Sequence, residues 1–187
     1  MKKALVAHLT LENNASLLKQ FTLIVCFSLL TAAGAWVTLP LSFSPVPITL
    51  QTLVVSLAGA VLGAKRGALS QLMYIGYGIC GLPVFAGGLT SIAVVLGPSG
   101  GYLIGFPVAA FLTGLLVSDN KNILWNLGAL IIGSLPVLLL GTLQLSLFTA
   151  GNLREAFAIG FVPFIAGDFI KCALAALILS GKQKLMQ

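Results

Sequence analysis

Six long apolar segments follow one another along the chain, and each is continuous rather than alternating in polarity. A bilayer core about 30 Å thick is crossed by about 20 helical residues, whereas a tilted membrane strand needs about ten. The pattern therefore predicts a helical membrane protein and disfavours a β-barrel. The expected spans are residues 17–39, 49–62, 68–82, 102–117, 123–148 and 157–179.

Charged side chains are too scarce to cover a soluble surface. Of the 187 residues, 58% are hydrophobic and 7% are charged, with ten Lys or Arg and four Asp or Glu. An ordinary soluble domain has about 25% charged residues. The soluble globular, disordered, coiled-coil and DNA-binding classes are therefore excluded. The net charge of +6 reflects scarce acids rather than clustered bases, so it does not predict a nucleic-acid partner.

The positions of the basic residues predict an orientation, because cytoplasmic loops of membrane proteins carry an excess of Lys and Arg. With six spans, Arg154 falls on one side and Lys171 lies inside the last span. The remaining basic residues fall together on the other side: Lys2, Lys3, Lys19, Lys65, Arg66, Lys121, Lys182 and Lys184. We therefore expect both termini in the cytoplasm.

The domain organisation follows from these spans. We expect a cytoplasmic N-terminal lead at residues 1–16, amphipathic or disordered, and a single six-helix membrane domain at residues 17–187. The two outer connections, residues 40–48 and 83–101, are uncharged and rich in Gly and Pro. Loops that face water are usually polar, so we expect these two to fold back over the bundle as lids. The expected fold is all-α.

Nothing in the sequence indicates catalysis, a metal or a cofactor. Three cysteines without a CxxC motif argue against a metal site or disulfide framework, and the single histidine, His8, lies in the lead. Residues 76–81 match GxGxxG, but no strand precedes them, so close helix packing explains these glycines better than a dinucleotide. The pairs Gly59-xxx-Gly63 and Gly101-xxx-Gly105 are interpreted in the same way.

Asp168 and Lys171 are the two ionisable residues inside the sixth span. Intramembrane charges are costly and usually mark functional sites. Their i,i+3 spacing places both on one helix face. Two interpretations remain open, an internal ion pair or a ligand site that offers a cation and an acceptor. A span that starts near Phe157 puts Asp168 about 16 Å from its outer end, and a start near Pro163 puts it closer.

Neutral polar residues near the outer side add to this candidate site. Gln51 and Thr49 stand at the start of the second span, Ser91 in the long connection, and Gln71 and Tyr74 in the third span. Together with Asp168 and Lys171 they predict a mostly apolar small-molecule site with a few polar groups.

Six motif blocks resemble the BioY family of biotin transporters. They are SPVPITLQT at 44–52, LAGAVLG at 57–63, RGALSQ at 66–71, GLPVFAGG at 81–88, LGPSGGY at 96–102 and PFIAGDFIK at 163–171. The resemblance implies a substrate-binding S-component of an energy-coupling-factor transporter in the bacterial cytoplasmic membrane. Such a protein is not an enzyme. It binds biotin from outside and docks on a module of two ATPase subunits and a coupling membrane protein.

The resemblance also implies roles for individual residues. Asp168, Lys171 and Gln51 match positions at the biotin site of the family. The chemistry agrees, because the biotin carboxylate suits Lys171 and its ureido N–H donors suit Asp168.

Two departures from the family pattern concern the site and the docking face. Some members have Asn and Arg where this chain has Leu89 and Leu103, so Lys171 is expected to carry more of the carboxylate binding, or Thr90 and Ser91 to substitute. Docking in the class uses an Ala-xxx-Ala face on the first helix, for which residues 17–39 offer Ser28-xxx-Ala32.

Two alternative functions stay open at this point. One is an S-component for another small vitamin, and the other is a membrane scaffold without transport activity.

Overall fold

The computed structural model describes residues 2–118 and 122–185, with side chains described for residues 16–118 and 122–181. The helices are α1 (Lys2–Trp36), α2 (Gln51–Leu62), α3 (Ala64–Ile79), α4 (Ile92–Leu96), α5 (Gly100–Leu116), α6 (Ile123–Ser146), α7 (Leu153–Gly160) and α8 (Val162–Leu185), with a short 3-10 helix η1 (Ala86–Gly88). Strands β1 (Thr38–Leu41) and β2 (Ser44–Thr49) pair in an antiparallel hairpin. Helix α5 packs against α2, α3 and α6, while α8 packs against α2 and α6.

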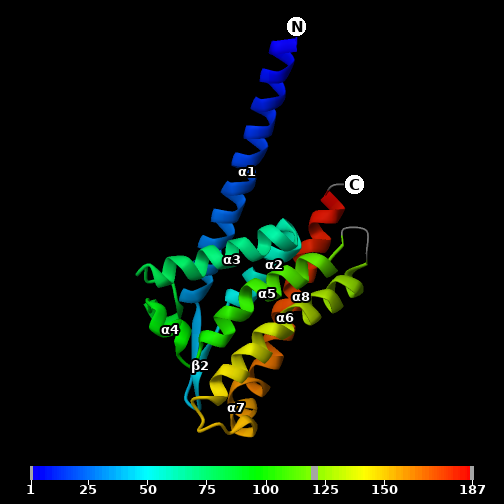
Figure 1. Cartoon of the computed structure of the whole chain (residues 1–187). Helices are drawn as coiled ribbons and strands as arrows, with labels where there is room; N and C mark the ends of the chain where they lie inside the picture. Colours follow the sequence, from blue (N-terminus) through cyan, green and yellow to red (C-terminus); the bar gives the residue numbers. More distant parts are fainter. Residues whose placement is uncertain (1, 119–121, 186–187) are drawn as a thin grey trace.

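The start of α1 and the end of α8 point toward the same end of the molecule, and the β-hairpin and α7 lie at the opposite end (Figure 1). The first half of α1 extends away from the bundle. Its backbone is helical from Lys2, so no break in secondary structure separates the expected lead, residues 1–16, from the first span. The cytoplasmic location of that segment stays a prediction.

The expectation of an all-α fold is wrong at residues 40–48, which belong to the hairpin rather than to an irregular loop. Thr38 pairs with Thr49 and Leu39 with Ile48, and the register shifts before Leu41. Proline lacks an N–H donor and is tolerated in edge strands, and both strands of a two-stranded sheet are edges. The alternation of Pro with β-branched residues in β2 therefore fits a strand and not a helix.

The expected sixth span, residues 157–179, is divided between two helices. Helix α7 ends at Gly160 and α8 begins at Val162, with Pro163 in its first turn, where proline fits because that N–H has no helical partner. Asp168 consequently lies about 9 Å from the start of α8, rather than about 16 Å along one long span. The later start near Pro163 is the one observed.

Within the described residues, three helical stretches are long and apolar enough to cross a membrane: Ser16–Trp36, Ile123–Ser146 and Leu153–Gly181. Helices α2 and α5 are apolar but shorter, with 12 and 17 residues. The chain is therefore a mostly helical membrane protein with several apolar helices. The number of complete crossings and the side of each terminus stay predictions.

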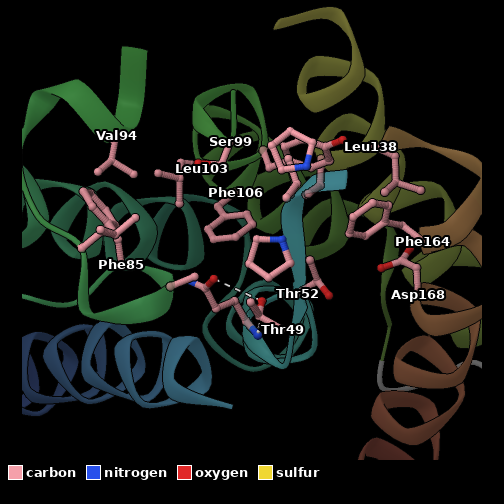
Figure 2. A pocket seen from close by; sticks show the side chains of 18 of the residues that line it. Thr49, Thr52, Phe85, Val94, Ser99, Leu103, Phe106, Leu138, Phe164 and Asp168 are labelled. Carbon is pink, nitrogen blue, oxygen red and sulfur yellow. Dashed lines mark hydrogen bonds between the residues drawn. The ribbon is translucent and has the colours of Figure 1, made fainter. Parts of the chain in front are cut away.

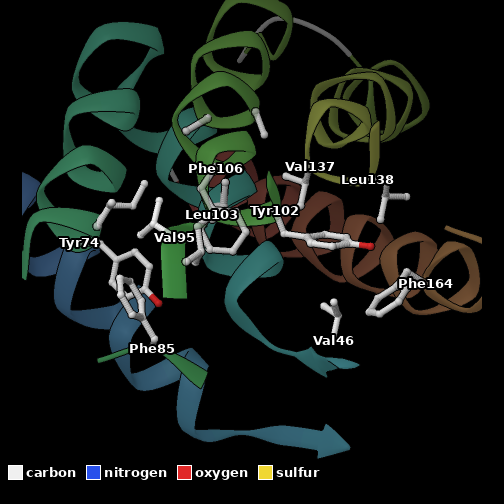
Figure 3. Close-up of a cluster of buried hydrophobic side chains, with 14 of the residues drawn as sticks. Val46, Tyr74, Phe85, Val95, Tyr102, Leu103, Phe106, Val137, Leu138 and Phe164 are labelled. Atoms are coloured by element: carbon white, nitrogen blue, oxygen red, sulfur yellow. The ribbon is translucent and has the colours of Figure 1, made fainter. Parts of the chain in front are cut away.

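The main core joins both outer connections to the bundle (Figure 3). Tyr74 of α3 is fully buried, and its ring meets Phe85 of the second connection edge-on at a centroid distance of 5.7 Å. Val46 of β2 and Phe164 of α8 belong to the same cluster. A second cluster lies around Leu130 and Cys172, where α6 meets α8. The outer connections are thus part of the packed interior.

The pair Ser28-xxx-Ala32 on α1 faces inward. Ser28 is 0% exposed and Ala32 is 8% exposed. Thr31 lies on the same face of α1, and its hydroxyl donates to Gln71 Oε1 of α3 at 3.1 Å. This small-residue pair packs α1 against the bundle, so it does not form an open docking face. Gln71 is likewise engaged in this helix contact.

Glycines allow the helices to approach closely, as their spacing predicts. A Cβ at Gly59 would collide with the backbone oxygen of Ala110, and Cβ atoms at Gly101 and Gly105 would collide with the backbone of α6. Gly63 has a different role, because it joins α2 to α3 with φ of 78°. The packing interpretation is confirmed for the other three.

The three glycines of the GxGxxG match at residues 76–81 also differ in their structural roles. A Cβ at Gly78 would enter the Phe85 ring, so this glycine is required for packing. Gly81 turns the chain with φ of 99°, and a Cβ at Gly76 would meet nothing within 4 Å.

This contrast gives a prediction about stability. Gly59→Ala is expected to destabilise the fold by about 1–3 kcal/mol, because the methyl group has to displace a neighbouring helix backbone. Gly76→Ala is the matched control, since it adds the same group to open space and gains about 0.5–1 kcal/mol of helix propensity. Thermal unfolding of the two purified variants in detergent checks the prediction. Equal midpoints for the two would contradict it.

Candidate small-molecule site

A cavity lies where both outer connections meet α2, α5, α6 and α8 (Figure 2). Its wall is mostly apolar, with aromatic surfaces from Phe85, Phe106 and Phe164. The strand β2 contributes Pro45 to Pro47 to it. Polar lining groups come from Thr49, Gln51, Thr52, Ser99, Asp168 and Lys171. This combination of an apolar wall with a few polar groups is the usual form of a small-molecule site.

Asp168 and Lys171 both line the cavity, as their spacing predicts, but each is bonded to a different helix. The Ser134 hydroxyl of α6 donates to Asp168 Oδ2 at 2.5 Å. Lys171 Nζ donates to Thr52 Oγ1 of α2 at 2.9 Å. Among the described residues the two charged groups form no ion pair with one another. The structure therefore does not support the interpretation as an internal ion pair.

Gln51 and Tyr74 form a buried hydrogen-bond chain that begins at the cavity wall. Gln51 Nε2 donates to the Tyr74 hydroxyl at 2.5 Å, and that hydroxyl donates to Val84 O at 3.2 Å. Thr49 Oγ1 donates to Gln51 Oε1 at 3.1 Å. Gln51 reaches the cavity, whereas Tyr74 is not a lining residue. These hydrogen bonds link four parts of the structure: the end of β2, α2, α3 and the second connection.

Ser91 is not among the residues that line the cavity. Its side-chain oxygen caps α4 by accepting from Ala93 N at 3.2 Å. The neighbouring Thr90 hydroxyl donates to Gly78 O at 3.0 Å. Both side chains therefore hold the second connection in place, and neither lines the cavity.

Sequence reasoning missed Thr52, Ser99 and Ser134. The first two line the cavity and the third contacts Asp168. Thr52 follows Gln51 directly, and Ser99 follows a proline in the second connection, so their proximity to other motif residues was an available signal. Ser134 stands in an unbroken apolar segment more than thirty positions before Asp168, and nothing in the sequence singles it out.

The described residues contain no group of three or more His, Cys, Asp or Glu that could hold a metal ion. What the cavity offers is an anion, a cation and neutral hydrogen-bond groups within an apolar wall. This arrangement can bind a small molecule that carries both an anionic group and hydrogen-bond donors.

Comparison with known proteins assigns the chain to a family. A sequence model described as the BioY family matches residues 3–187. The chain belongs to the BioY family.

Relatives with this family name cover most of the chain. It is 42% identical over 159 residues to "Biotin transporter BioY" of Thermotoga maritima, which is 85% of this chain and 92% of the relative. It is 38% identical over 181 residues to "Biotin transporter BioY" of Rhodobacter capsulatus, at 90% and 92% coverage. A solved structure described as the S-component for biotin from an ECF-type ABC transporter matches with a TM-score of 0.82, 30% identity and coverage of 92% and 93%.

Leu89 and Leu103, the two departures from the BioY pattern, both line the cavity. Leu103 is buried, whereas Leu89 is more than half exposed. They make two parts of the wall apolar. Among the described lining residues, this leaves Lys171 as the sole cation.

The backbone at Ser91 gives the second prediction. Its φ of 92° and ψ of 163° lie in a region that is essentially restricted to glycine and costs about 1–3 kcal/mol. Ser91→Gly removes this strain. It also loses the side-chain cap of α4, but glycine at a helix N-cap costs only about a few tenths of a kcal/mol relative to serine. Ser91→Ala keeps the strain and loses the cap.

Ser91→Gly is therefore expected to unfold at a higher temperature than Ser91→Ala, by a few degrees for about 1–2 kcal/mol in a chain of this size. Thermal unfolding in detergent measures the difference. A Ser91→Ala midpoint equal to or above that of Ser91→Gly would show that the strain is not present.

Proposed function

We propose that this protein binds biotin in the cavity between the outer connections and α8, and that it is the S-component of an energy-coupling-factor biotin transporter. It carries out transport and no covalent chemistry. The observation that carries the proposal is a carboxylate and an ammonium that share one wall of an apolar cavity and, among the described residues, form no ion pair with one another, in a chain of the BioY family.

The chemistry of biotin supports the assignment of contacts. Its carboxylate is complementary to the Lys171 ammonium, and its ureido N–H groups are donors that a carboxylate such as Asp168 accepts. Its aliphatic chain and thiolane ring are apolar, as is most of the wall around Phe106 and Phe164. Because Leu89 and Leu103 offer no polar group, Lys171 carries the charge of the biotin carboxylate in this chain.

The direct test is equilibrium binding of biotin to the purified protein. Asp168→Asn and Lys171→Gln are each expected to weaken binding by about 10- to 100-fold, because a hydrogen bond to a charged group contributes about 1.5–3 kcal/mol. Glu155→Gln and Lys65→Gln are matched controls, because they make the same changes at residues outside the cavity. Absence of biotin binding by the wild-type protein would refute the proposal. Tight binding of another vitamin in that titration would favour the alternative S-component.

We also propose that the chain crosses a bacterial cytoplasmic membrane six times with both termini in the cytoplasm. The common direction of the start of α1 and the end of α8 supports this orientation (Figure 1), as does the distribution of basic residues. Helices α2, α3 and α5 are shorter than a typical span, and the hairpin and α4 complete the outer side of the bundle.

Cysteine accessibility tests the orientation. In a variant that lacks Cys26, Cys80 and Cys172, a cysteine introduced at Arg154 is expected to react with a membrane-impermeant maleimide added to intact cells. A cysteine introduced at Lys65 is expected to react only after the membrane is opened. The reverse pattern would invert the proposed orientation, and labelling of both in intact cells would refute the span number.

Two ATPase subunits and a coupling membrane protein are the proposed partners. The inward direction of Ser28 and Ala32 means that docking uses other residues of α1, such as its exposed face near Leu30. Uptake of labelled biotin in cells with and without such a module distinguishes coupled transport from transport by this chain alone. Co-purification with a module without any uptake would favour the scaffold.

A further inference from the structure

The two charged groups of α8 are close in sequence, and both line the cavity, yet among the described residues they are not bonded to one another. Opposite charges at i,i+3 lie on one helix face and attract strongly where water is scarce. A direct ion pair is the simple outcome for such a pair. Its absence requires that other groups hold each charge in place.

Ser134 holds the carboxylate from α6. Its side chain is 2% exposed, so its position is fixed by packing. The hydroxyl donates to Asp168 Oδ2 at 2.5 Å and lies 3.0 Å from Ile131 O in its own helix. A hydroxyl has one proton, and the charged acceptor at the shorter distance is the stronger partner. Ser134 therefore fixes the carboxylate on the side of α6.

Thr52 holds the ammonium from α2. Its Oγ1 accepts from Lys171 Nζ at 2.9 Å, and Thr52 itself lines the cavity. The Thr52 hydroxyl proton has no acceptor among the described residues. Thr52 and Lys171 thus form a pair of neighbouring donors suited to one carboxylate.

We propose that Thr52 and Ser134 are positioning residues, which hold the ammonium and the carboxylate of α8 apart so that both remain available to the ligand. This inference rests on the proposed biotin site. A direct Asp168–Lys171 ion pair would have to be broken before either group could bind the ligand. The Thr52 hydroxyl also adds a second donor for the carboxylate end of the ligand.

The first test compares biotin with biotin methyl ester, which lacks the negative charge. Thr52→Val is expected to weaken the binding of both ligands, because the released ammonium pairs with Asp168, and to weaken biotin by about tenfold more than the ester, because a donor to the carboxylate is lost as well. Ser134→Ala is expected to weaken both ligands, because both keep the ureido ring that Asp168 binds. Thr52→Ser, which keeps the hydroxyl, is expected to restore the wild-type preference.

Thr113→Val is the matched control, because this buried hydroxyl has no hydrogen-bond partner among the described residues and is not in the cavity wall. It is expected to leave both affinities unchanged. Equal losses of biotin and ester in Thr52→Val would assign Thr52 a merely structural role and overturn the proposal.

The second test needs no ligand, so it separates this inference from the proposed function. The shifts in unfolding temperature of Asp168→Asn and Lys171→Gln are measured singly and together, in the wild-type background and in a Thr52→Val background. Their deviation from additivity is expected to be clearly larger in Thr52→Val, where the released ammonium pairs with Asp168, than in the wild type. Additivity of the same degree in both backgrounds would overturn the proposal, whether or not the protein binds biotin.

Discussion

An ionised side chain in an apolar environment has to be satisfied by specific partners, and helix α8 carries two such side chains. Asp168 is satisfied from α6 and Lys171 from α2. These contacts exist because α8 packs against both helices at the level of the cavity. The arrangement of α2, α6 and α8 therefore determines whether the two charges neutralise one another or remain available for a ligand.

Short side chains can serve as partners only if the helices that carry them lie close together. The side chains of Thr52 and Ser134 are short, and each offers a single hydroxyl group close to its helix backbone. Helix α5 lies between α2 and α6, and it approaches α2 through Gly59 and α6 through Gly105. A Cβ at either glycine would collide with a backbone. These glycines thus set the helix spacing on which the polar contacts depend.

The positions of the apolar helices and of the charged pair could be predicted from the sequence, because both follow from local periodicity and from the cost of charge in a membrane. The hairpin at residues 38–49 could not, since apolar Pro-rich segments fit a loop as well as a strand. The break at Phe161 was predicted only as the alternative of a later start near Pro163, because hydropathy is continuous through it. In the site, Ser134 and the separation of Asp168 from Lys171 depend on tertiary contacts, which helix spacing alone does not specify.

The outer connections are bonded to the same residues that form the cavity. Gln51 reaches the cavity and is hydrogen-bonded to Tyr74, which in turn donates to Val84 of the second connection. Gln144 of α6 donates to Val95 O and Gly97 O further along that connection. A ligand that contacts Gln51 therefore contacts a group whose hydrogen bonds also hold the second connection in place. Within that connection, the strained backbone of Ser91 is held by bonds from Ser91 N and the Thr90 hydroxyl to Gly78 O of α3. The packing around the cavity and the conformation of its outer cover are therefore parts of one structural unit.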